Sequence, residues 1–254
     1  VGRPRPVEVA PAHLEDVAGE LNVLKRKVVH KRLQAVEALG QANIIAVDKT
    51  GTLTKNELVV QKLFVHDTIF DVSGVGYEPT GDITCNDMPA GEHPGVQYLA
   101  RLVGLSASAK IFGRGDKIKV TGDPTEAALT VFAGKLGKYQ DDLRHVSPVL
   151  SDVPFDYKNK FYAMLISETP QNLGIVVGAP EVVIQKCTQS WRSDGEHKLT
   201  QEMRNDLYQQ MEDFSREGLR VIAVAHKVTK KKSFHENDVE ALSFIGFCAM
   251  KEDR

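Results

Sequence analysis

The feature that most constrains the fold is an aspartate directly after a short, β-branched apolar run. Residues 43–48 read NIIAVD, and residues 48–54 read DKTGTLT. A short run rich in isoleucine and valine is typical of a strand buried on both faces, as in a parallel sheet. Open α/β sheets bind ligands at the carboxyl ends of their strands. The sequence therefore predicts an α/β domain with Asp48 at its functional edge.

Asp48 has the chemistry of a nucleophile at such a position. A carboxylate there can attack a phosphoryl group and form an acyl phosphate, which splits one difficult transfer into two easier steps. The transfer needs mainly positioning and charge neutralisation, and Mg²⁺ would bridge the carboxylate and the phosphate oxygens. Gly51 allows the turn to approach the phosphate closely, while threonine hydroxyl groups and backbone amides supply donors.

The complete DKTGTLT segment resembles the phosphorylation signature of the P-type ATPases. The segment FDVSGVGYEPTGDI at 70–83 is similar to the early nucleotide-domain hairpin of their type II, calcium-pump-like branch. The resemblance implies that ATP phosphorylates Asp48 and that Lys49 and Thr50 lie at the phosphate. It also implies that Asp48 and Thr50 contact Mg²⁺, Thr50 through its backbone carbonyl. ATP and Mg²⁺ are thus the expected cofactors.

The order of the remaining segments predicts one domain inserted into another. Apolar strands at 43–47 and 243–249 bracket a long region of mixed helices and strands. With the resemblance, we expect an α/β fold: a partial haloacid-dehalogenase-like (Rossmann-type) phosphorylation domain interrupted by a large α+β nucleotide-binding domain with a mostly antiparallel sheet. The expected parts are an arm or linker at 1–30, the first part of the phosphorylation domain at 31–57, the nucleotide-binding domain at 58–238, and a return strand into the phosphorylation domain at 239–254.

The inserted region carries clear signals for individual elements. Strands are expected at 57–65, 68–74, 160–167, 173–178 and 219–226, and helices at 94–109, 122–137 and 200–217. The helix at 122–137 has the strongest start, because Asp123 can cap it and Pro124 suits its first position. Glu126 stands where a capping box places an acid. Gly218 is expected to end the last of these helices.

The resemblance also assigns residues to adenine recognition. It places Glu126 near the adenine amino group, a role that can coexist with helix capping. It places Phe155 where an aromatic ring stacks on adenine and Lys160 where a lysine lines the same pocket. The alternatives are that Phe155 is a core residue and that Lys160 is simply solvated.

Three further positions bear on the rest of the nucleotide. The segment VVGAPE at 176–181 is similar to a family motif that begins with lysine, but Val177 occupies the lysine position. Gly178 would still allow the backbone to approach the nucleotide closely. Arg220 corresponds to an arginine that reaches the phosphates, with a solvated strand end as the alternative. The loss of the lysine should weaken nucleotide binding.

Composition restricts the classes of partner. A formal net charge of −2 gives no electrostatic case for nucleic acid, and the basic run at 230–232 is interpreted as a solvated turn. No stretch approaches eighteen apolar residues, so we expect no membrane span in this chain. The expected partners are ATP and the remainder of a P-type ATPase: the rest of the phosphorylation domain, the actuator domain and the membrane helices. The resemblance places the chain at the cytoplasmic face of a membrane.

Two alternatives to an ion pump remain open on sequence grounds. A soluble haloacid-dehalogenase-type phosphatase shares the aspartate-first chemistry, but it normally has a second aspartate where this chain has Thr50. A non-catalytic nucleotide-binding module is the other, and Val177 gives it some support. The later catalytic segments of the family do not follow in this sequence, so we expect the chain to bind ATP but to phosphorylate itself poorly.

Overall fold

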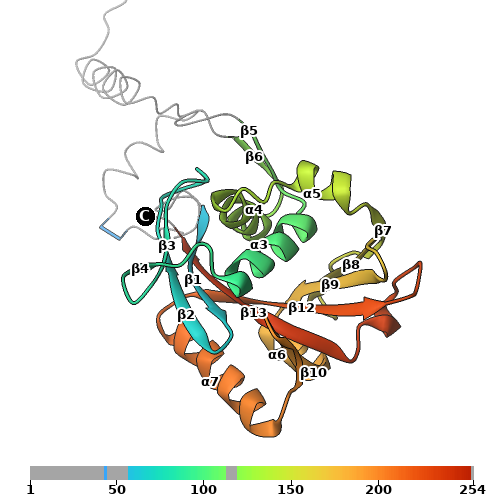
Figure 1. Ribbon diagram of the computed structural model, residues 1–254. Helices are drawn as coiled ribbons and strands as arrows, with labels where there is room; N and C mark the ends of the chain where they lie inside the picture. Colours follow the sequence, from blue (N-terminus) through green and yellow to red (C-terminus); the bar gives the residue numbers. More distant parts are fainter. Residues whose placement is uncertain (1–42, 45–56, 113–118, 253–254) are drawn as a thin grey trace, which may run out of the picture. The chain divides into compact units, whose positions relative to one another are not determined.

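The computed structural model of the chain describes residues 43–44, 57–112 and 119–252 (Figure 1). The chain divides into two compact units, Val1–Asp48 and Lys49–Arg254, and the second is described here by itself. The predicted phosphorylation segment with Asp48, Lys49 and Thr50 lies outside the described residues. The predicted arm at 1–30 and most of the predicted strand at 43–47 lie outside them as well.

Within the described residues, an 11-stranded sheet forms the centre of this unit, and its main path is β4-β3-β2-β1-β13-β12-β9-β8-β7. Neighbours along this path are antiparallel, whereas β10 joins β13 in parallel and pairs with β11 in antiparallel fashion. The strands are β1 (Leu58–Val65), β2 (Thr68–Val72), β3 (Ile83–Cys85), β4 (Met88–Pro89), β7 (Val149–Val153), β8 (Phe161–Ile166), β9 (Asn172–Gly178), β10 (Cys187–Arg192), β11 (Gly195–Lys198), β12 (Arg220–Thr229) and β13 (Leu242–Glu252). The predicted mostly antiparallel sheet is confirmed.

Helices cover both faces of this sheet (Figure 1). The helices are α3 (Pro94–Ser106), α4 (Pro124–Lys135), α5 (Gln140–Val146), α6 (Pro180–Lys186) and α7 (Gln201–Arg216), with a short 3₁₀ helix η2 (Glu236–Asp238) and a separate hairpin of β5 (Lys110–Phe112) and β6 (Lys119–Thr121). The core on one face includes Leu99 of α3 and Phe132 of α4, and the core on the other includes Val183 of α6 and Phe214 of α7. We call these the α3–α4 face and the α6–α7 face.

The alternation of side chains in each strand supplies both cores. In β8, Met164 packs on the α3–α4 face, while Phe161 and Leu165 pack on the α6–α7 face. Successive residues of a strand point to opposite sides of a sheet, so a strand covered on both faces must be apolar almost throughout. The near-continuous apolar runs of β8, β9 and β13 follow from this requirement.

The helix signals in the sequence are confirmed where they are strongest. Asp123 caps α4 by accepting a hydrogen bond from the Thr125 backbone N–H at 2.8 Å, with Pro124 in the first helical position. Thr200 caps α7 in the same way, through the Met203 backbone N–H at 3.2 Å. Gly218 follows the end of α7 with φ +77°, a conformation that favours glycine.

The last strand corrects one prediction. We expected residues 239–254 to return into the phosphorylation domain, but β13 is central in the inserted sheet, between β1 and β12. Its first nine residues are all buried. An apolar run without alternation indicates only that both faces are covered, and helices on both faces of an antiparallel sheet satisfy that condition equally well.

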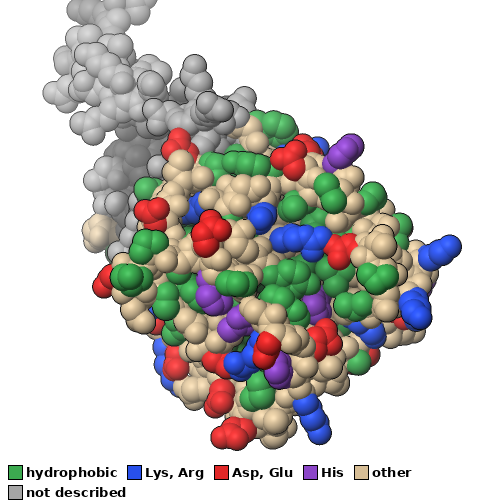
Figure 2. Space-filling model, viewed as in Figure 1, with side chains coloured by type: hydrophobic (Ala, Val, Ile, Leu, Met, Phe, Trp, Pro, Cys, Tyr) green, Lys and Arg blue, Asp and Glu red, His purple; other side chains and the backbone are tan. Residues whose placement is uncertain are grey.

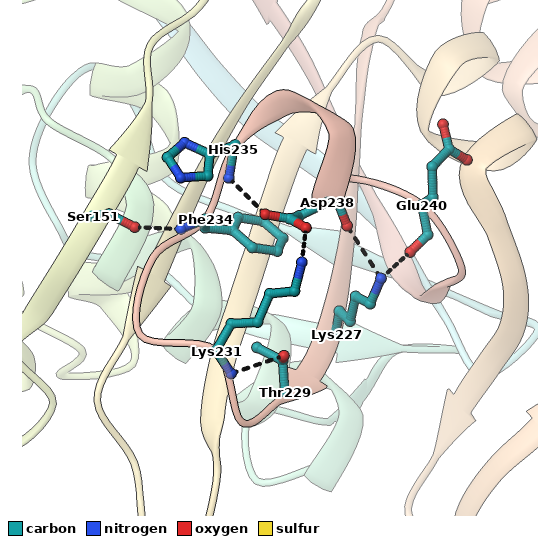
Figure 3. A network of polar contacts seen from close by, with 8 residues as sticks. All are labelled: Ser151, Lys227, Thr229, Lys231, Phe234, His235, Asp238 and Glu240. Carbon is teal, nitrogen blue, oxygen red and sulfur yellow. Dashed lines mark hydrogen bonds and ion pairs between the residues drawn. The ribbon is translucent and has the colours of Figure 1, made fainter.

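The basic turn between β12 and β13 is held by polar contacts (Figure 3). Lys231 Nζ donates to the Asp238 carboxylate, which also accepts from the His235 backbone N–H at 3.0 Å. Lys227 Nζ donates to the backbone carbonyls of Asp238 at 3.1 Å and Glu240 at 2.6 Å. The lysines at 230–232 are exposed, as the interpretation of a solvated turn expected, and Lys231 in addition contacts Asp238.

The surface of the described part carries charges of both signs. Figure 2 shows acidic and basic side chains interspersed with apolar ones on the face in view, as expected for a chain with a formal net charge of −2. Among the helices that the structure describes, none is long and apolar enough to cross a membrane. The three cysteines are free thiols, and burial raises the pKa of Cys187 to about 12.

Candidate nucleotide-binding site

The first turn of α4 presents two of the polar groups near the predicted site. The Asp123 cap fixes the start of the helix, and Thr125 and Glu126 follow within its first turn. The Glu126 carboxylate accepts a hydrogen bond from the Ser108 hydroxyl group through Oε2. This contact orients the carboxylate from outside the helix, so the side chain is anchored to a neighbouring loop.

Arg220 lies beside this turn although it is 94 positions away from Glu126 in the sequence. Its Nη1 donates to the Thr125 hydroxyl oxygen at 3.1 Å, which joins the start of β12 to the start of α4. Arg220 is exposed, as the alternative interpretation of a solvated strand end also expected. The hydrogen bond to Thr125 nevertheless gives the guanidinium group a defined position near Glu126.

The loop at 154–160, between β7 and β8, holds Phe155 at the surface. The Phe155 side chain is 55% exposed, so the alternative that it is a core residue is wrong. Its ring makes an edge contact with Tyr157 at 5.4 Å between centroids. Asp156 Oδ1 accepts from the Lys158 backbone N–H at 2.6 Å, and the Asp156 carbonyl accepts from the Lys160 N–H at 2.7 Å. More than half of the Phe155 side chain therefore faces solvent.

Lys160 and Gly178 meet where β8 begins and β9 ends. The Lys160 carbonyl accepts a hydrogen bond from the Ala179 N–H at 2.9 Å, and Gly178 is the residue before Ala179. A Cβ atom at Gly178 would lie 2.5 Å from the Lys160 carbonyl oxygen and 2.6 Å from Phe161 Cβ. Glycine is thus required at position 178, because a side chain there would collide with Lys160 and Phe161. Lys160 Nζ lies 3.3 Å from the Glu181 carboxylate, and both side chains are about half exposed.

Strand pairing brings these segments to one end of the sheet. Gly178 of β9 pairs with Phe161 of β8 on one side and with Ala223 of β12 on the other. The start of β8, the end of β9 and the start of β12 therefore lie side by side. Glu126 and Arg220 are connected to this end through Thr125. The residues predicted from four separate motifs thus belong to the same end of the domain: Glu126, Phe155, Lys160, Gly178 and Arg220.

One residue at this end was missed by the sequence analysis. Tyr162 of β8 lies directly across from Val177 of β9, which pairs in turn with Val224 of β12. Burial is the main cause that raises the pKa of the Tyr162 phenol to about 12, with smaller effects of Asp152 and Glu126, which raise it, and of Arg144, which lowers it. Only the strand register reveals this neighbourhood.

A cavity in the described part lies away from the predicted residues. It has a volume of about 700 Å³ and is lined by residues that include Tyr77, Phe112, Thr130 and Tyr139, without any of the five predicted residues. Three of those predicted residues, Phe155, Lys160 and Arg220, are exposed at the strand ends. No group of three or more histidine, cysteine or acidic residues able to hold a metal ion occurs within the residues that the structure describes. The predicted Mg²⁺ contacts, Asp48 and Thr50, lie outside those residues.

Comparison with known proteins decides the family. Residues 96–253 match the family model described as the P-type ATPase, cytoplasmic domain N. The chain belongs to the P-type ATPase family. This match covers β13 and agrees with its place in the sheet of the inserted domain.

Curated relatives extend the similarity over most of the chain. It is 32% identical to the cation-transporting ATPase pma1 of Synechocystis sp. over 91% of the chain and 26% of that relative. It is 30% identical to a calcium-transporting ATPase of Bacillus subtilis, over 84% of the chain and 24% of the relative. It is 34% identical to the calcium-transporting ATPase type 2C member 1 of Bos taurus, over 82% and 22% respectively. The chain thus spans about a quarter of the length of these relatives, and none of them is named as a phosphatase.

Proposed function

We propose that this chain is the ATP-binding and phosphorylation region of a P-type ATPase that couples ATP hydrolysis to cation transport across a membrane. The coupling would proceed through an aspartyl phosphate at Asp48, with Lys49 and Thr50 at the phosphate and Mg²⁺ held by Asp48 and Thr50. The family match and the relatives' names, which include cation-transporting and calcium-transporting ATPases, support this assignment. The observation that most supports it is that strand pairing and the Arg220–Thr125 hydrogen bond bring residues of four separate motifs to one end of the sheet.

Each of these residues has a role that fits its observed position. Phe155 offers an exposed ring on which adenine can stack, worth roughly 1–3 kcal/mol per base by analogy with nucleic-acid binding. The Glu126 carboxylate can accept from the adenine amino group, and its Oε2 is oriented by Ser108. Lys160, just before β8, can line the adenine pocket, and Arg220 at the start of β12 can supply positive charge for the phosphates. Gly178 keeps the Lys160 backbone in place.

The remainder of the pump would complete the reaction. The proposed partners are the rest of the phosphorylation domain, an actuator domain and membrane helices, with this chain at the cytoplasmic face of the membrane. Because carboxylates of the Mg²⁺ site would come from those missing segments, the isolated chain should bind ATP without efficient phosphoryl transfer. Strong, hydroxylamine-labile incorporation of phosphate from ATP would contradict this expectation.

Calorimetric titration with ATP tests the binding site directly. We expect the wild-type chain to bind ATP and Phe155→Ala to bind at least about tenfold more weakly, which corresponds to about 1.4 kcal/mol. Tyr139→Ala is the matched control, because Tyr139 is also an exposed aromatic residue (52%) but lies at the separate cavity. Equal affinity of Phe155→Ala and wild type would place the adenine elsewhere. If the wild type does not bind, binding regained by Val177→Lys would assign the defect to that valine.

A further inference from the structure

Two neighbouring histidine rings each have a buried nitrogen atom without a hydrogen-bond partner. His66 follows β1 in the β1–β2 turn, and His93 precedes α3. Their ring centroids lie 5.5 Å apart in an edge-to-face arrangement. Nε2 of His66 and Nδ1 of His93 are buried, and neither is hydrogen-bonded to another group of the part that the structure describes. Most buried polar atoms in proteins are hydrogen-bonded, so this pair is an exception that calls for an explanation.

The two rings join three segments that are distant in the sequence. The His66 ring contacts Trp191 of β10 at 5.3 Å between centroids, and the His93 ring contacts Phe70 of β2 at 4.9 Å. A Cβ atom at Gly95 would lie 2.9 Å from His66 Cε1, so the imidazole packs directly on the first turn of α3. The histidine pair therefore holds the β1–β2 turn against the start of α3 and against β10.

The charges around His66 disfavour a proton on its ring. The titratable and charged groups near it come from its own turn, from the start of α3, from β10 and the turn after it, and from α7: Asp67, His93, Arg192, Asp194 and Asp206. Burial is the main cause that lowers the pKa of His66, and the positive charges of His93 and Arg192 lower it further. The two carboxylates of the turns have smaller effects that raise it, and one of them, Asp67, forms an ion pair with Arg192.

Protonation would change what the His66 ring requires. A neutral imidazole has one N–H donor, whereas an imidazolium has a donor on both nitrogens and a positive charge. In the observed packing, Nε2 of His66 has no acceptor among the described groups, and the ring is only partly exposed. A partly buried charge without a partner is costly. We propose that His66 and His93 form a pH-sensitive latch: the neutral rings hold the β1–β2 turn against α3 and β10, and protonation of His66 in mild acid releases the turn.

The direction of the pH dependence follows from the lowered pKa. The unfolded state takes up the proton at the ordinary pKa of 6.5, and the folded state takes it up only at lower pH. The contribution of His66 to stability is therefore fully present above pH 6.5 and is lost as the pH falls from there through the folded-state pKa. Within this window, one histidine that only the unfolded state protonates lowers the folding equilibrium constant by up to about tenfold per pH unit.

Trp191 reports on the latch, because it is the single tryptophan of the chain and its ring contacts His66. We expect the fluorescence of the 254-residue chain to change between pH 8 and pH 5 while its far-UV circular dichroism stays native. His66→Asn should lose most of this change, and its folding constant, measured by urea unfolding, should fall less steeply with decreasing pH. Asparagine does not titrate and tolerates the φ of +51° at this position. His145→Gln is the matched control, because His145 is exposed on α5, and it should behave like wild type.

Two outcomes would overturn the latch. One is a constant Trp191 fluorescence between pH 8 and pH 5, and the other is the same change in His66→Asn as in wild type. The second result would assign the signal to His226, whose ring lies 6.5 Å from that of Trp191. His93→Gln tests the pair itself: without the neighbouring positive charge, the midpoint of the fluorescence change should move to higher pH, and an unmoved midpoint would remove His93 from the latch. If circular dichroism shows that His66→Asn does not fold, His66→Gln is the second variant without a titrating ring.

Discussion

Two loops of the same sheet combine a phenylalanine with lysine and aspartate side chains, yet the fold uses them differently. In the β12–β13 loop, Phe234 is 2% exposed and its ring covers Gly174, where a Cβ atom would lie 2.9 Å from Phe234 Cζ. The Phe234 backbone N–H also donates to the Ser151 hydroxyl oxygen at 2.8 Å (Figure 3). In the β7–β8 loop, Phe155 is 55% exposed, and its described ring contact is with Tyr157, itself 89% exposed.

The lysines of the two loops differ in their partners and not in their exposure, since Lys231 is 61% exposed and Lys160 is 54% exposed. Lys231 donates to Asp238, whose carboxylate is largely buried and also accepts from a backbone N–H of the loop. Lys160 has a longer, 3.3 Å contact to Glu181, which is about half exposed. The β7–β8 loop, which we propose binds ATP, thus leaves its aromatic and charged groups less engaged by the fold than the β12–β13 loop does. Composition is similar in the two cases and does not distinguish them.

The two phenylalanines should separate most clearly in stability. Phe234→Ala removes a buried ring and should lower the free energy of unfolding by about 3–5 kcal/mol. Phe155→Ala removes an exposed ring and should change it by no more than about 0.5 kcal/mol. Urea-induced unfolding of both variants measures this difference. Similar losses in the two variants would mean that Phe155 has a core role that its exposure does not indicate.

Substitution of Gly178 tests whether ATP binding by the β7–β8 loop depends on the close packing between β8 and β9. Gly178→Ala would push a Cβ atom against the Lys160 carbonyl and Phe161, so we expect a loss of about 1–3 kcal/mol in the free energy of unfolding. ATP affinity should fall as well, because the start of β8 must move. In Gly91→Ala, the nearest atom to the new Cβ is Leu136 Cδ2 at 3.5 Å, an ordinary contact, so this control should stay close to wild type. An unperturbed Gly178→Ala would show that β8 can shift without cost.

Local signals in the sequence predicted local structure well. Asp123 and Pro124 marked a helix start, and Gly218 marked a helix end, because caps depend on residues within one turn. The place of β13 was predicted wrongly, since pairing with β1 and β12 depends on residues far apart in the chain. An apolar run indicates that a strand is covered on both faces, but it does not indicate which sheet contains the strand.

The candidate site shows the same limit. Motif resemblance predicted Glu126, Phe155, Lys160, Gly178 and Arg220 from four separate segments, and only strand pairing and the Arg220–Thr125 hydrogen bond relate these segments in space. Tyr162 was assigned no role from the sequence, because its position opposite Val177 follows from the strand register. The exposure of Phe155 and the burial of Phe234 could not be read from two loops of similar composition.

Acid should weaken the β12–β13 loop through Asp238. The hydrogen bond from Lys231, followed by that from the His235 backbone, lowers the pKa of this carboxyl below its ordinary value of 3.8. The folded state therefore binds the proton less readily than the unfolded state. The contribution of Asp238 is fully present above pH 3.8 and is lost as the pH falls through the folded-state pKa. In urea unfolding across the acid range, the stability of Asp238→Asn should fall less steeply with decreasing pH than that of wild type. Parallel curves would show that Asp238 is not linked to folding.

The smallest effects on stability are expected from substitution of Lys231 and Lys160. Each variant is compared with wild type in both stability and ATP affinity. Lys231→Met removes the partner of Asp238 and should lower the free energy of unfolding by about 0.2–1 kcal/mol, as for an exposed ion pair, while ATP affinity stays unchanged. Lys160→Met removes a half-exposed contact, so stability should change even less, but ATP affinity should fall several-fold because a positive charge leaves the site. Methionine retains much of the apolar length of lysine, so the two variants differ from wild type mainly in charge. Calorimetric titration measures the ATP affinity of each variant, and urea unfolding measures its free energy of unfolding. We expect Lys231→Met to lose stability but not affinity, and Lys160→Met to lose affinity with little change in stability. Loss of ATP affinity in Lys231→Met but not in Lys160→Met would contradict this expectation and would assign ATP binding to the β12–β13 loop.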